Sequence, residues 1–281
     1  MVMVPDWETN KVFYSFLSTY DFKIELGKLR RFLKESNLGY GHIAGTKDYF
    51  CRDYMPIQIS ENEYIQFNFK PDYLLRNEKM LGFVTDTETV FRKNSFFKKF
   101  KIQKSELILD GGNIIKSKNR VIVTDKVVQD NNLPLEEIRE KLEKLFNAKV
   151  IIIPKFPGEE TGHADGIIRF IDEETVLTIN LDDENAEWKD KLIKELKLSN
   201  LNIISLPKAK SPDKDWRYIN YLHVATKVIV PSFENDSDKI ILPFLHALFE
   251  KYGIKMTTIN AVNIAEQGGI LNCFTWNIFE Q

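Results

Sequence analysis

The chain has 281 residues, of which 43% are hydrophobic and 12% aromatic, so a sizeable core is expected and global disorder is excluded. Its 39 Lys and Arg nearly balance 41 Asp and Glu, and a net charge of −2 gives no overall attraction to nucleic acid. Two cysteines cannot form a disulfide framework, and the first residues have neither the basic region of a signal peptide nor the length of a membrane span. We therefore expect a cytoplasmic protein with no membrane or nucleic-acid partner.

Five amphipathic segments are predicted to form helices along the chain. They are IELGKLRRFLKES (24–36), ETVFRKNSFFKKF (88–100), PLEEIREKLEKLF (134–146), WKDKLIKELK (188–197) and KIILPFLHALFEKYG (239–253). The third begins with Pro134, a residue favoured in the first turn of a helix. The fifth ends at Gly253, as a helix cap commonly does.

Short apolar and β-branched runs between and after these helices are predicted to be strands. They are YIQFNF (64–69), SELILD (105–110), RVIVTD (120–125), KVIIIP (149–154), TVLTINL (175–181), LNIISLP (201–207), KVIVPSF (227–233) and IKMTTIN (254–260). The helices recur at roughly 45 to 65 residues, which indicates a repeated strand–helix unit. Five such units can close radially like propeller blades, while an ordinary open α/β sheet explains the same alternation. No linker divides the sequence, so we expect one domain over residues 1–281.

Among the four histidines, His163 is the strongest candidate for chemistry. It lies between glycines in PGEETGHADGIIRF, with Asp165 two residues later. In an extended segment these two side chains point to the same side, so the carboxylate would hold the imidazole and raise its basicity. A His-x-Asp pair in a loop is also commonly incidental. The other three, His42, His223 and His246, lack metal-ligand spacing and are predicted to be structural or exposed.

Two cysteines and one further acid complete the candidates. Cys273 lies in the closing segment GGILNCFTWNIFEQ, which we predict to be a strand. Alone it is a small buried hydrophobe, but with His163 it is a candidate thiolate nucleophile. Cys51 in YFCRDYMP is predicted to pack in the core, next to the more promising Asp53. Asp110 in LILDGGNII is predicted to present a carboxylate from a sharp turn, or to be a simple turn signal.

Taken together, four motifs in this order resemble one family. FCRDYMP, LDGGNI, GHADG and GGILNCFTW resemble the agmatine deiminase and bacterial peptidylarginine deiminase family, and VPDWE and YINYLHVATKVIVPSF resemble further segments of it. This resemblance implies the pentein fold, a five-bladed α/β propeller of five ββαβ repeats around a pseudo-fivefold axis. Equivalent groups would then recur once per repeat, and the relevant residues are indeed separated by 57, 53, 57 and 53 positions: Asp53, Asp110, His163, Asn220 and Cys273.

The resemblance also implies a reaction, the hydrolysis of a guanidinium to a ureido group and ammonia through a covalent thiouronium on Cys273. His163 would act as general acid and base, and Asp165 and Asp110 complete the catalytic set. The implied substrate-binding residues are Asp53, Asn113, Asn220 and Arg52. No metal or organic cofactor is expected. A small guanidino substrate is favoured, with agmatine converted to N-carbamoylputrescine in putrescine biosynthesis.

Several residues depart from the agmatine deiminase pattern and keep alternatives open. Asp110 stands where those enzymes carry glutamate, and Asn272 stands where they carry histidine. Phe50 and Met55 replace the tryptophan and glycine of the first motif. A peptidylarginine deiminase and a non-catalytic pentein binding module remain alternatives, and the oligomeric state, homo-oligomer included, is left open. A papain-like hydrolase is disfavoured, because there the cysteine precedes the histidine.

Overall fold

The computed structural model describes residues 2–182, 184–210 and 216–281. Within these ranges lie five three-stranded sheets built on one plan, in which the middle strand pairs antiparallel with one neighbour and parallel with the other. In sheet order they are β15–β1–β2 (Thr275–Ile278, Lys11–Ser15, Gly39–Ile43), β3–β4–β5 (Ile57–Gln58, Glu63–Asn68, Lys101–Ile108), β6–β7–β8 (Ile115–Lys116, Arg120–Thr124, Lys149–Ile153), β9–β10–β11 (Ile168–Phe170, Thr175–Thr178, Asn202–Ser205) and β12–β13–β14 (Leu222–Val224, Lys227–Ser232, Lys255–Asn260).

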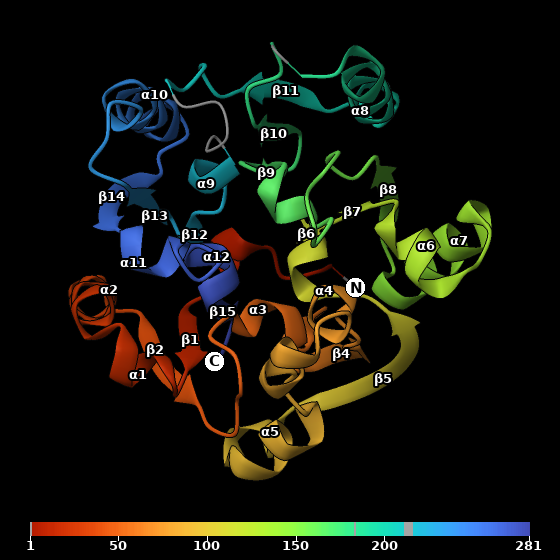
Figure 1. Cartoon of the computed structure of the whole chain (residues 1–281), viewed down its shortest axis with the longest axis vertical. Coiled ribbons are helices and arrows are strands. Elements are labelled where there is room, and N and C mark those ends of the chain that lie inside the picture. The colour runs from red at the N-terminus through yellow and green to blue at the C-terminus, as the bar shows by residue number, and fades with distance from the viewer. Residues whose placement is uncertain (1, 183, 211–215) are drawn as a thin grey trace.

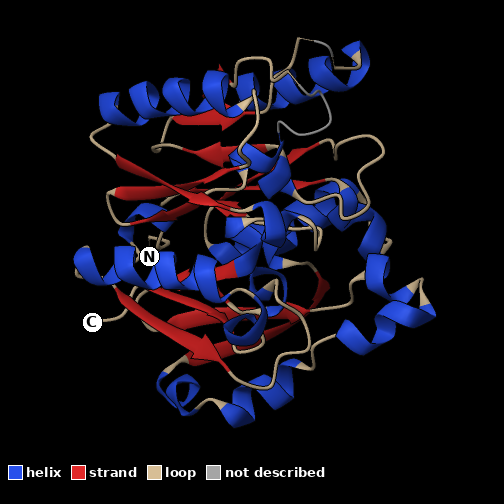
Figure 2. Ribbon diagram, turned by 60° about the vertical axis from the view of Figure 1, so that its left-hand side comes forward, coloured by secondary structure: helices blue, strands red, loops and turns tan. Residues whose placement is uncertain are grey.

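Helices connect the middle strand of each sheet to its parallel partner, as a parallel pair requires. In chain order these helices are α1 and α2 (Ser18–Asp21, Lys23–Glu35), α4 and α5 (Asp72–Leu75, Thr87–Lys93), α6 and α7 (Lys126–Asn131, Leu135–Phe146), α8 (Ala186–Leu198) and α10 (Asp238–Lys251). Each repeat therefore reads strand, strand, helix, strand. In Figure 1 the sheets are arranged around the middle of the molecule, and Figure 2 shows helices on the outer side of the strands.

The first sheet contains both ends of the chain, because the C-terminal β15 pairs antiparallel with β1, from Lys11↔Ile278 to Tyr14↔Thr275. The strand order confirms the α/β class. In the part of the chain that the structure describes, strands pair only within each set of three, and none of these sheets closes on itself. The closed five-bladed propeller is therefore not confirmed by the strand pairing and stays a prediction.

The five predicted helices and the eight strands predicted between and after them are present, with one helix divided. The segment expected over 88–100 ends as α5 at Lys93, and a 3-10 helix, η3 (Ser95–Lys99), follows. Asn94 separates them with an extended backbone, while its side-chain Nδ2 donates to Val90 O and Ala44 O. This polar side chain thus satisfies carbonyls at the helix end and terminates the helix.

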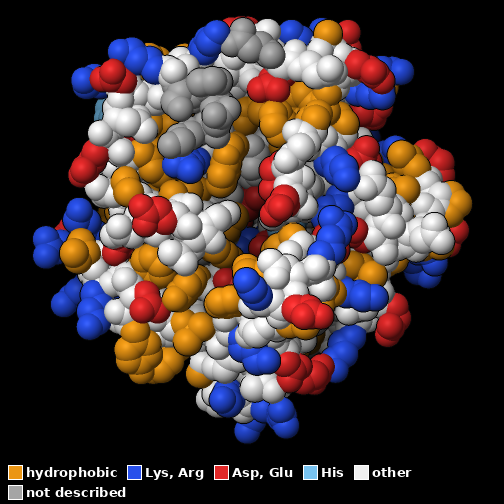
Figure 3. Space-filling model, in the orientation of Figure 1, with side chains coloured by type: hydrophobic (Ala, Val, Ile, Leu, Met, Phe, Trp, Pro, Cys, Tyr) orange, Lys and Arg blue, Asp and Glu red, His pale blue; other side chains and the backbone are white. Residues whose placement is uncertain are grey.

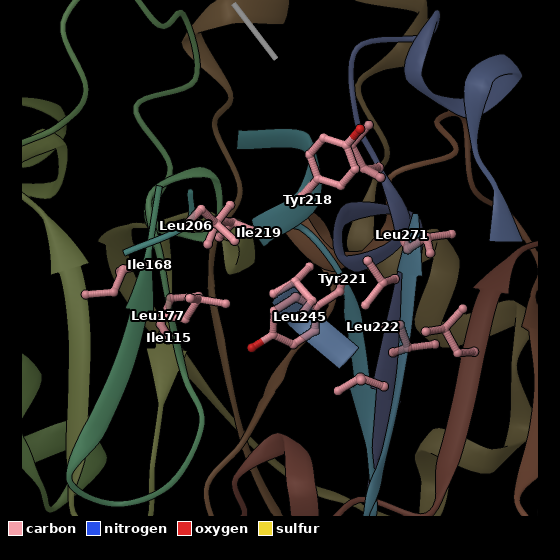
Figure 4. Close-up of a cluster of buried hydrophobic side chains, with 14 of the residues drawn as sticks. Ile115, Ile168, Leu177, Leu206, Tyr218, Ile219, Tyr221, Leu222, Leu245 and Leu271 are labelled. Atoms are coloured by element: carbon pink, nitrogen blue, oxygen red, sulfur yellow. The ribbon is translucent and has the colours of Figure 1, made fainter. Parts of the chain in front are cut away.

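The hydrophobic core runs between sheets. Figure 4 shows part of the largest cluster, in which side chains from different sheets and turns meet: Ile115, Ile168, Leu177, Leu206, Tyr218, Ile219, Tyr221, Leu222, Leu245 and Leu271. All are buried, and full burial of such a side chain stabilises the fold by about 1.5–3 kcal/mol. Because one cluster contains side chains from several sheets, the sheets stabilise one another.

None of the helices in the described ranges combines the length and the apolar character needed to cross a membrane.

Candidate active site

Five short helical turns carry the candidate site residues, and each turn lies just before the first strand of a sheet. They are α3 (Cys51–Tyr54), η4 (Gly111–Asn113), η5 (Ala164–Gly166), α9 (Trp216–Ile219) and α12 (Leu271–Phe274), before β3, β6, β9, β12 and β15. In Figure 1 several of these turns lie near the middle of the view, and the surface seen from the same side is hollowed there (Figure 3). The near-equal spacing of the candidate residues thus has a structural cause, since each lies in or beside the equivalent turn.

Hydrogen bonds join each turn to the next. Gly112 N donates to Asp53 Oδ1 at 2.9 Å, which links η4 to α3. His163 Nε2 lies 3.0 Å from Asp110 Oδ2, and Asn220 Nδ2 donates to Asp165 O at 3.5 Å.

Two further bonds complete the circuit. Asn220 Oδ1 accepts from Cys273 N at 3.2 Å, which links α9 to α12. Arg52 Nε then donates to Asn272 O at 3.2 Å, which returns the circuit from α12 to α3. The five turns therefore hold one another in position.

Cys273 lies in a one-turn helix, so the strand predicted over the whole closing segment is wrong for its first half. The helix spans Leu271–Phe274, and β15 begins only at Thr275. Thr275 Oγ1 donates to Leu271 O at 2.7 Å, which satisfies a carbonyl at the helix end. Because this part of the segment forms a turn and not a strand, the backbone N–H of Cys273 can donate to the side chain of Asn220.

His163 lies between two carboxylates. Its Nε2 is 3.0 Å from Asp110 Oδ2, and its Nδ1 is 3.6 Å from Asp53 Oδ1. Burial lowers the pKa of His163, but the charges of Asp53, Asp110 and Asp165 outweigh it and raise the pKa to about 10. The imidazole is therefore protonated at neutral pH.

Asp53 is held in the same buried group of charges. Burial raises the pKa of Asp53 to about 7, with the His163 charge opposing the rise and Asp110 and Asp165 adding to it. Its carboxylate accepts from Gly112 N and, at 3.3 Å, from the hydroxyl of Tyr73. A buried acid near neutral pKa beside a protonated imidazole is an arrangement typical of functional sites.

The thiol of Cys273 contacts an acid and an amide. Its Sγ lies 3.3 Å from Asp165 Oδ2 and 3.2 Å from Asn220 Nδ2. Burial raises the pKa of Cys273 well above its usual value, and the charges of Asp165 and Asp53 raise it further. The thiol is therefore protonated, and a cation bound among these acids would favour its ionisation. The charge of Asp165 raises the pKa of Cys273 and also that of His163, so the two groups share one electrostatic environment.

The two glycines after Asp110 lie so close to neighbouring segments that a side chain would not fit at either position. A Cβ on Gly111 would lie 2.0 Å from the backbone oxygen of Arg52. A Cβ on Gly112 would lie 2.5 Å from Asp53 Oδ1 and 2.6 Å from His163 Nδ1. The Asp-Gly-Gly stretch thus forms a tight 3-10 turn that packs against the charged side chains.

Three of the predicted substrate-binding residues have protein partners. Asn113 Oδ1 accepts from Thr124 N at 2.9 Å, and Asn220 binds the backbone and thiol of Cys273. Arg52 is 6% exposed and donates to Asn272 O and Asn277 Oδ1. Their direct contact with substrate stays a prediction.

Tyr73 was missed from the sequence. Its hydroxyl donates to Asp53 Oδ2, and its ring meets His163 edge-on with centroids 5.9 Å apart. Lys126 holds the helix that carries it, because Nζ pairs with Asp72 Oδ1 at 2.9 Å and with Asp130 Oδ2 at 2.7 Å. A single tyrosine in a four-residue helix has no periodic pattern that would reveal it.

The remaining candidates lie apart from these contacts. Cys51 is fully buried in a hydrophobic cluster, and its Sγ faces Phe274 O at 3.4 Å. His223 is 1% exposed, and burial lowers its pKa to about 4. Across the described ranges, no group of three or more His, Cys, Asp and Glu side chains is arranged to hold a metal ion.

A cysteine thiol, a protonated imidazole and three buried carboxylates on a frame of five ββαβ repeats define a guanidino-modifying type of site, since planar cations need paired carboxylates. The sequence matches the family described as Porphyromonas-type peptidyl-arginine deiminase over residues 30–278, and the chain belongs to that family. Related deiminases are hydrolases that act on the C–N bonds of linear amidines, which makes this protein an enzyme of that class.

Solved structures share the fold over almost the whole chain. The agmatine deiminase of C. jejuni superposes with a TM-score of 0.74 at 19% identity, covering 99% of this chain and 96% of its own. The agmatine deiminase of Enterococcus faecalis gives 0.76 at 18% identity, covering 99% and 95%. DDAH from Pseudomonas aeruginosa gives 0.61 at 13% identity, covering 96% and 99%. These are pentein-fold proteins, and no curated protein matches the sequence.

Proposed function

We propose that this protein is a guanidino iminohydrolase that converts a guanidinium to a ureido group and ammonia through a thiouronium on Cys273. The observation that carries the proposal is that the partly buried Cys273 lies with the buried His163, Asp53, Asp110 and Asp165 on turns linked by hydrogen bonds. The circuit of bonds through the five turns also supports a five-bladed ring in a single domain over residues 1–281.

The carboxylates form a binding site for a planar cation. Asp53 and Asp165 hold guanidinium nitrogens, and Asp110 completes the acidic surroundings. Asp110 Oδ1 is buried and has no hydrogen-bond partner among the described residues, so one acceptor is open for a substrate N–H. Three acids against one imidazolium leave negative charge in the site, which a guanidinium neutralises. Charge-assisted hydrogen bonds of this kind are about twice as strong as neutral ones.

Substrate binding generates the nucleophile. In the free enzyme, the Cys273 proton is retained because partial burial and the surrounding acids raise the pKa of the thiol. The bound cation offsets those charges and lowers the thiol pKa, and a carboxylate of the site accepts the thiol proton. The Cys273 sulfur then forms a bond to the guanidinium carbon.

His163 transfers protons in both halves of the reaction. Its Nδ1 lies 3.6 Å from Asp53 Oδ1, which is too long for a hydrogen bond, so the Nδ1 proton is available to the substrate. This proton passes to the departing nitrogen as the C–N bond breaks and ammonia leaves. Neutral His163 then takes a proton from the attacking water, and the C–S bond breaks. The departing sulfur takes its proton back from the carboxyl group, and the ureido product forms as its extra proton is released to solvent.

The solved relatives support a cysteine-dependent reaction. The C. jejuni agmatine deiminase was determined as a Cys-to-Ser variant with substrate bound. The Pseudomonas aeruginosa DDAH was determined as a Cys-to-Ser variant in complex with citrulline, a ureido compound. Cys273 is our candidate for the corresponding thiol, and no metal or organic cofactor takes part in the proposed reaction.

For the substrate we favour a small guanidino compound, agmatine, with N-carbamoylputrescine as product. Agmatine deiminases are among the structures that share the fold. Peptidyl-arginine is the second candidate, favoured by the description of the matching family. Asp110 also fits the second candidate, because its carboxylate reaches one methylene less far than a glutamate would toward a distal amine. Retention of the thiol, imidazole and acids together disfavours a non-catalytic role.

The test measures ureido product from agmatine, free arginine and an internal-arginine peptide. The unaltered enzyme is compared with Cys273→Ala, and with Cys51→Ala as the matched control for loss of a thiol. We expect turnover by the enzyme and by Cys51→Ala, none by Cys273→Ala, and no effect of chelators. Absence of ureido product from all three substrates would contradict the proposed function. Tenfold faster kcat/KM for the peptide would overturn agmatine and leave the chemistry standing.

A further inference from the structure

The N-terminal segment Met3–Thr9 is bound by residues of the first strands of several sheets. Lys116 of β6 donates to Val4 O, and Arg169 of β9 pairs with Asp6 Oδ2 at 2.7 Å. Asn277 of β15 donates to Thr9 Oγ1 at 2.8 Å. In Figure 1 the N-terminus lies near the middle of the molecule, where these strands meet. None of these contacts belongs to the substrate site described above.

Asp6 is the carboxylate that faces several buried cations in this region. Its side chain is 18% exposed and that of its partner Arg169 is 2% exposed. Burial raises the pKa of Asp6, but the charges of Arg52, Arg169 and Lys116 outweigh it and lower the pKa to about 2. Asp6 is therefore ionised at any working pH and stabilises the buried cations of Arg52, Arg169 and Lys116.

A chain of hydrogen bonds connects this segment to the nucleophile. Asn277 Nδ2 donates to Thr9 Oγ1 at 2.8 Å, to His223 O at 3.0 Å and to Asp6 Oδ1 at 3.4 Å, and these acceptors together orient the amide. Its Oδ1 then accepts from Arg52 Nη2. The neighbouring Arg52 Nε donates to Asn272 O, the carbonyl that precedes Cys273. A guanidinium holds these two donors in one rigid plane, so fixing one fixes the other.

We propose that Asp6, Thr9 and Asn277 act as positioning residues that hold Arg52, and through it the Cys273 turn, in the reactive geometry. This inference rests on the proposed function, since it takes Cys273 as the nucleophile. In this proposal Arg52 binds a backbone carbonyl of the Cys273 turn, in place of the predicted contact with substrate. Asp6 and Thr9 of the N-terminal segment are thereby part of the machinery that aligns the thiol, although they touch no substrate.

The proposal has two measurable consequences. A displacement of about 1 Å of a reacting group can lower the rate about 10²-fold, so loosening the turn lowers kcat while KM changes little. A thiol that moves away from Asp165 also loses a charge that raises its pKa. Its alkylation should then begin at lower pH. A role confined to general stability would change neither quantity well below the melting temperature.

The experiment compares Asp6→Asn and Thr9→Val with Glu8→Gln in the full-length enzyme. Glu8 lies in the same segment, but its pair with Lys118 is half-exposed, at 41% and 39%, and contacts none of the chain of bonds. Thr9→Val keeps the charge and shape of the region and removes the acceptor for Asn277 together with the bond that Thr9 Oγ1 donates to Asp6 O, so it tests the proposal if Asp6→Asn fails to fold. Alkylation of Cys273 by iodoacetamide is followed by peptide mass spectrometry across pH, and kcat and KM are measured on the substrate identified above.

We expect Asp6→Asn and Thr9→Val to lower kcat by about 10- to 100-fold, within the range for a displaced reacting group, with Glu8→Gln unchanged. We also expect the alkylation profile of both variants to shift to lower pH. Folded variants whose alkylation profile and kcat equal those of Glu8→Gln would overturn the proposal. If the unaltered enzyme processes no guanidino compound, the alkylation profile still decides whether the segment positions the thiol, so the two failures can be told apart.

Discussion

Asp165→Asn removes one charge from the centre of the site without changing its shape. Asp165 is 2% exposed, and its Oδ2 accepts from Asn272 Nδ2 at 2.7 Å while contacting Cys273 Sγ at 3.3 Å. In the variant the amide oxygen can keep the Asn272 bond in the same volume. The substitution therefore separates the charge of Asp165 from its packing.

The size of the effect follows from the lost charged hydrogen bond. Such a bond contributes about 1.5–3 kcal/mol, which corresponds to a loss of roughly 10- to 150-fold in kcat/KM. Its effect on the proton transfers of His163 acts in the same direction, so we expect a loss on the order of 10² or more. The thiol should change in the opposite sense. Since Asp165 raises the pKa of Cys273, the variant thiol should be alkylated at lower pH than the unaltered thiol.

The assay is kcat/KM for ureido formation together with the pH dependence of iodoacetamide alkylation at Cys273. Glu137→Gln is the control, because Glu137 is 45% exposed on α7 and its pair with Lys141 lies on the surface. Unchanged kcat/KM in Asp165→Asn would refute the role of the charge in binding and catalysis. An unchanged alkylation profile would refute the reasoning about the thiol.

Three further predictions test other contacts of the site. The value of kcat/KM should rise through about pH 7, because Asp53 loses its proton there and can then bind a cation. It should fall through about pH 10 as His163 loses its proton. A flat profile from pH 6 to 8 would contradict the role given to Asp53. Gly112→Ala should displace the side chains of Asp53 and His163 and so lower activity with little loss of stability. Gly111→Ala should lower the melting temperature, because its Cβ would collide with the backbone of Arg52. Equal effects of the two variants on melting temperature and on turnover would count against the close-approach argument. Tyr73→Phe removes the donor to Asp53 Oδ2 and should weaken substrate binding by about 0.5–1.5 kcal/mol, seen as a rise in KM of a few-fold. A KM equal to that of the unaltered enzyme would show that the hydroxyl is dispensable.

Periodicity identified the long helices and the strands that surround the site. The twelve residues of α7 are long enough to show a full helical pattern of apolar positions, which predicts one buried face. Ile138, Leu142 and Phe146 lie on that face and are buried. The five short turns had no such signal. α12 is four residues long, and its conformation depends on Asn220, which is 53 positions away along the chain from Cys273. The segment could therefore be predicted only as a strand, from its apolar and aromatic composition.

The candidate site was predictable in part because its members lie in four motifs that resemble one family, FCRDYMP, LDGGNI, GHADG and GGILNCFTW. What the sequence could not supply were contacts made by long-range packing. The pairing of β15 with β1 joins the two chain ends, and the bond of Arg52 to Asn277 joins residues that are 225 positions apart along the chain. Tyr73 reaches Asp53 only because its helix is held by Lys126. Likewise, the glycines after Asp110 were interpreted as a turn signal, since close approach to another segment leaves no local pattern.

The most direct test of the central claim is the intact mass of the protein after rapid acid quench during turnover of agmatine. If Cys273 is the nucleophile, the quenched enzyme should carry an amidino adduct, and peptide mapping should place it on Cys273. Replacing His163 with alanine, which slows hydrolysis of the adduct, should increase its amount wherever attack still occurs. Detection of ureido product with no adduct, or an adduct on Cys51, would contradict the account.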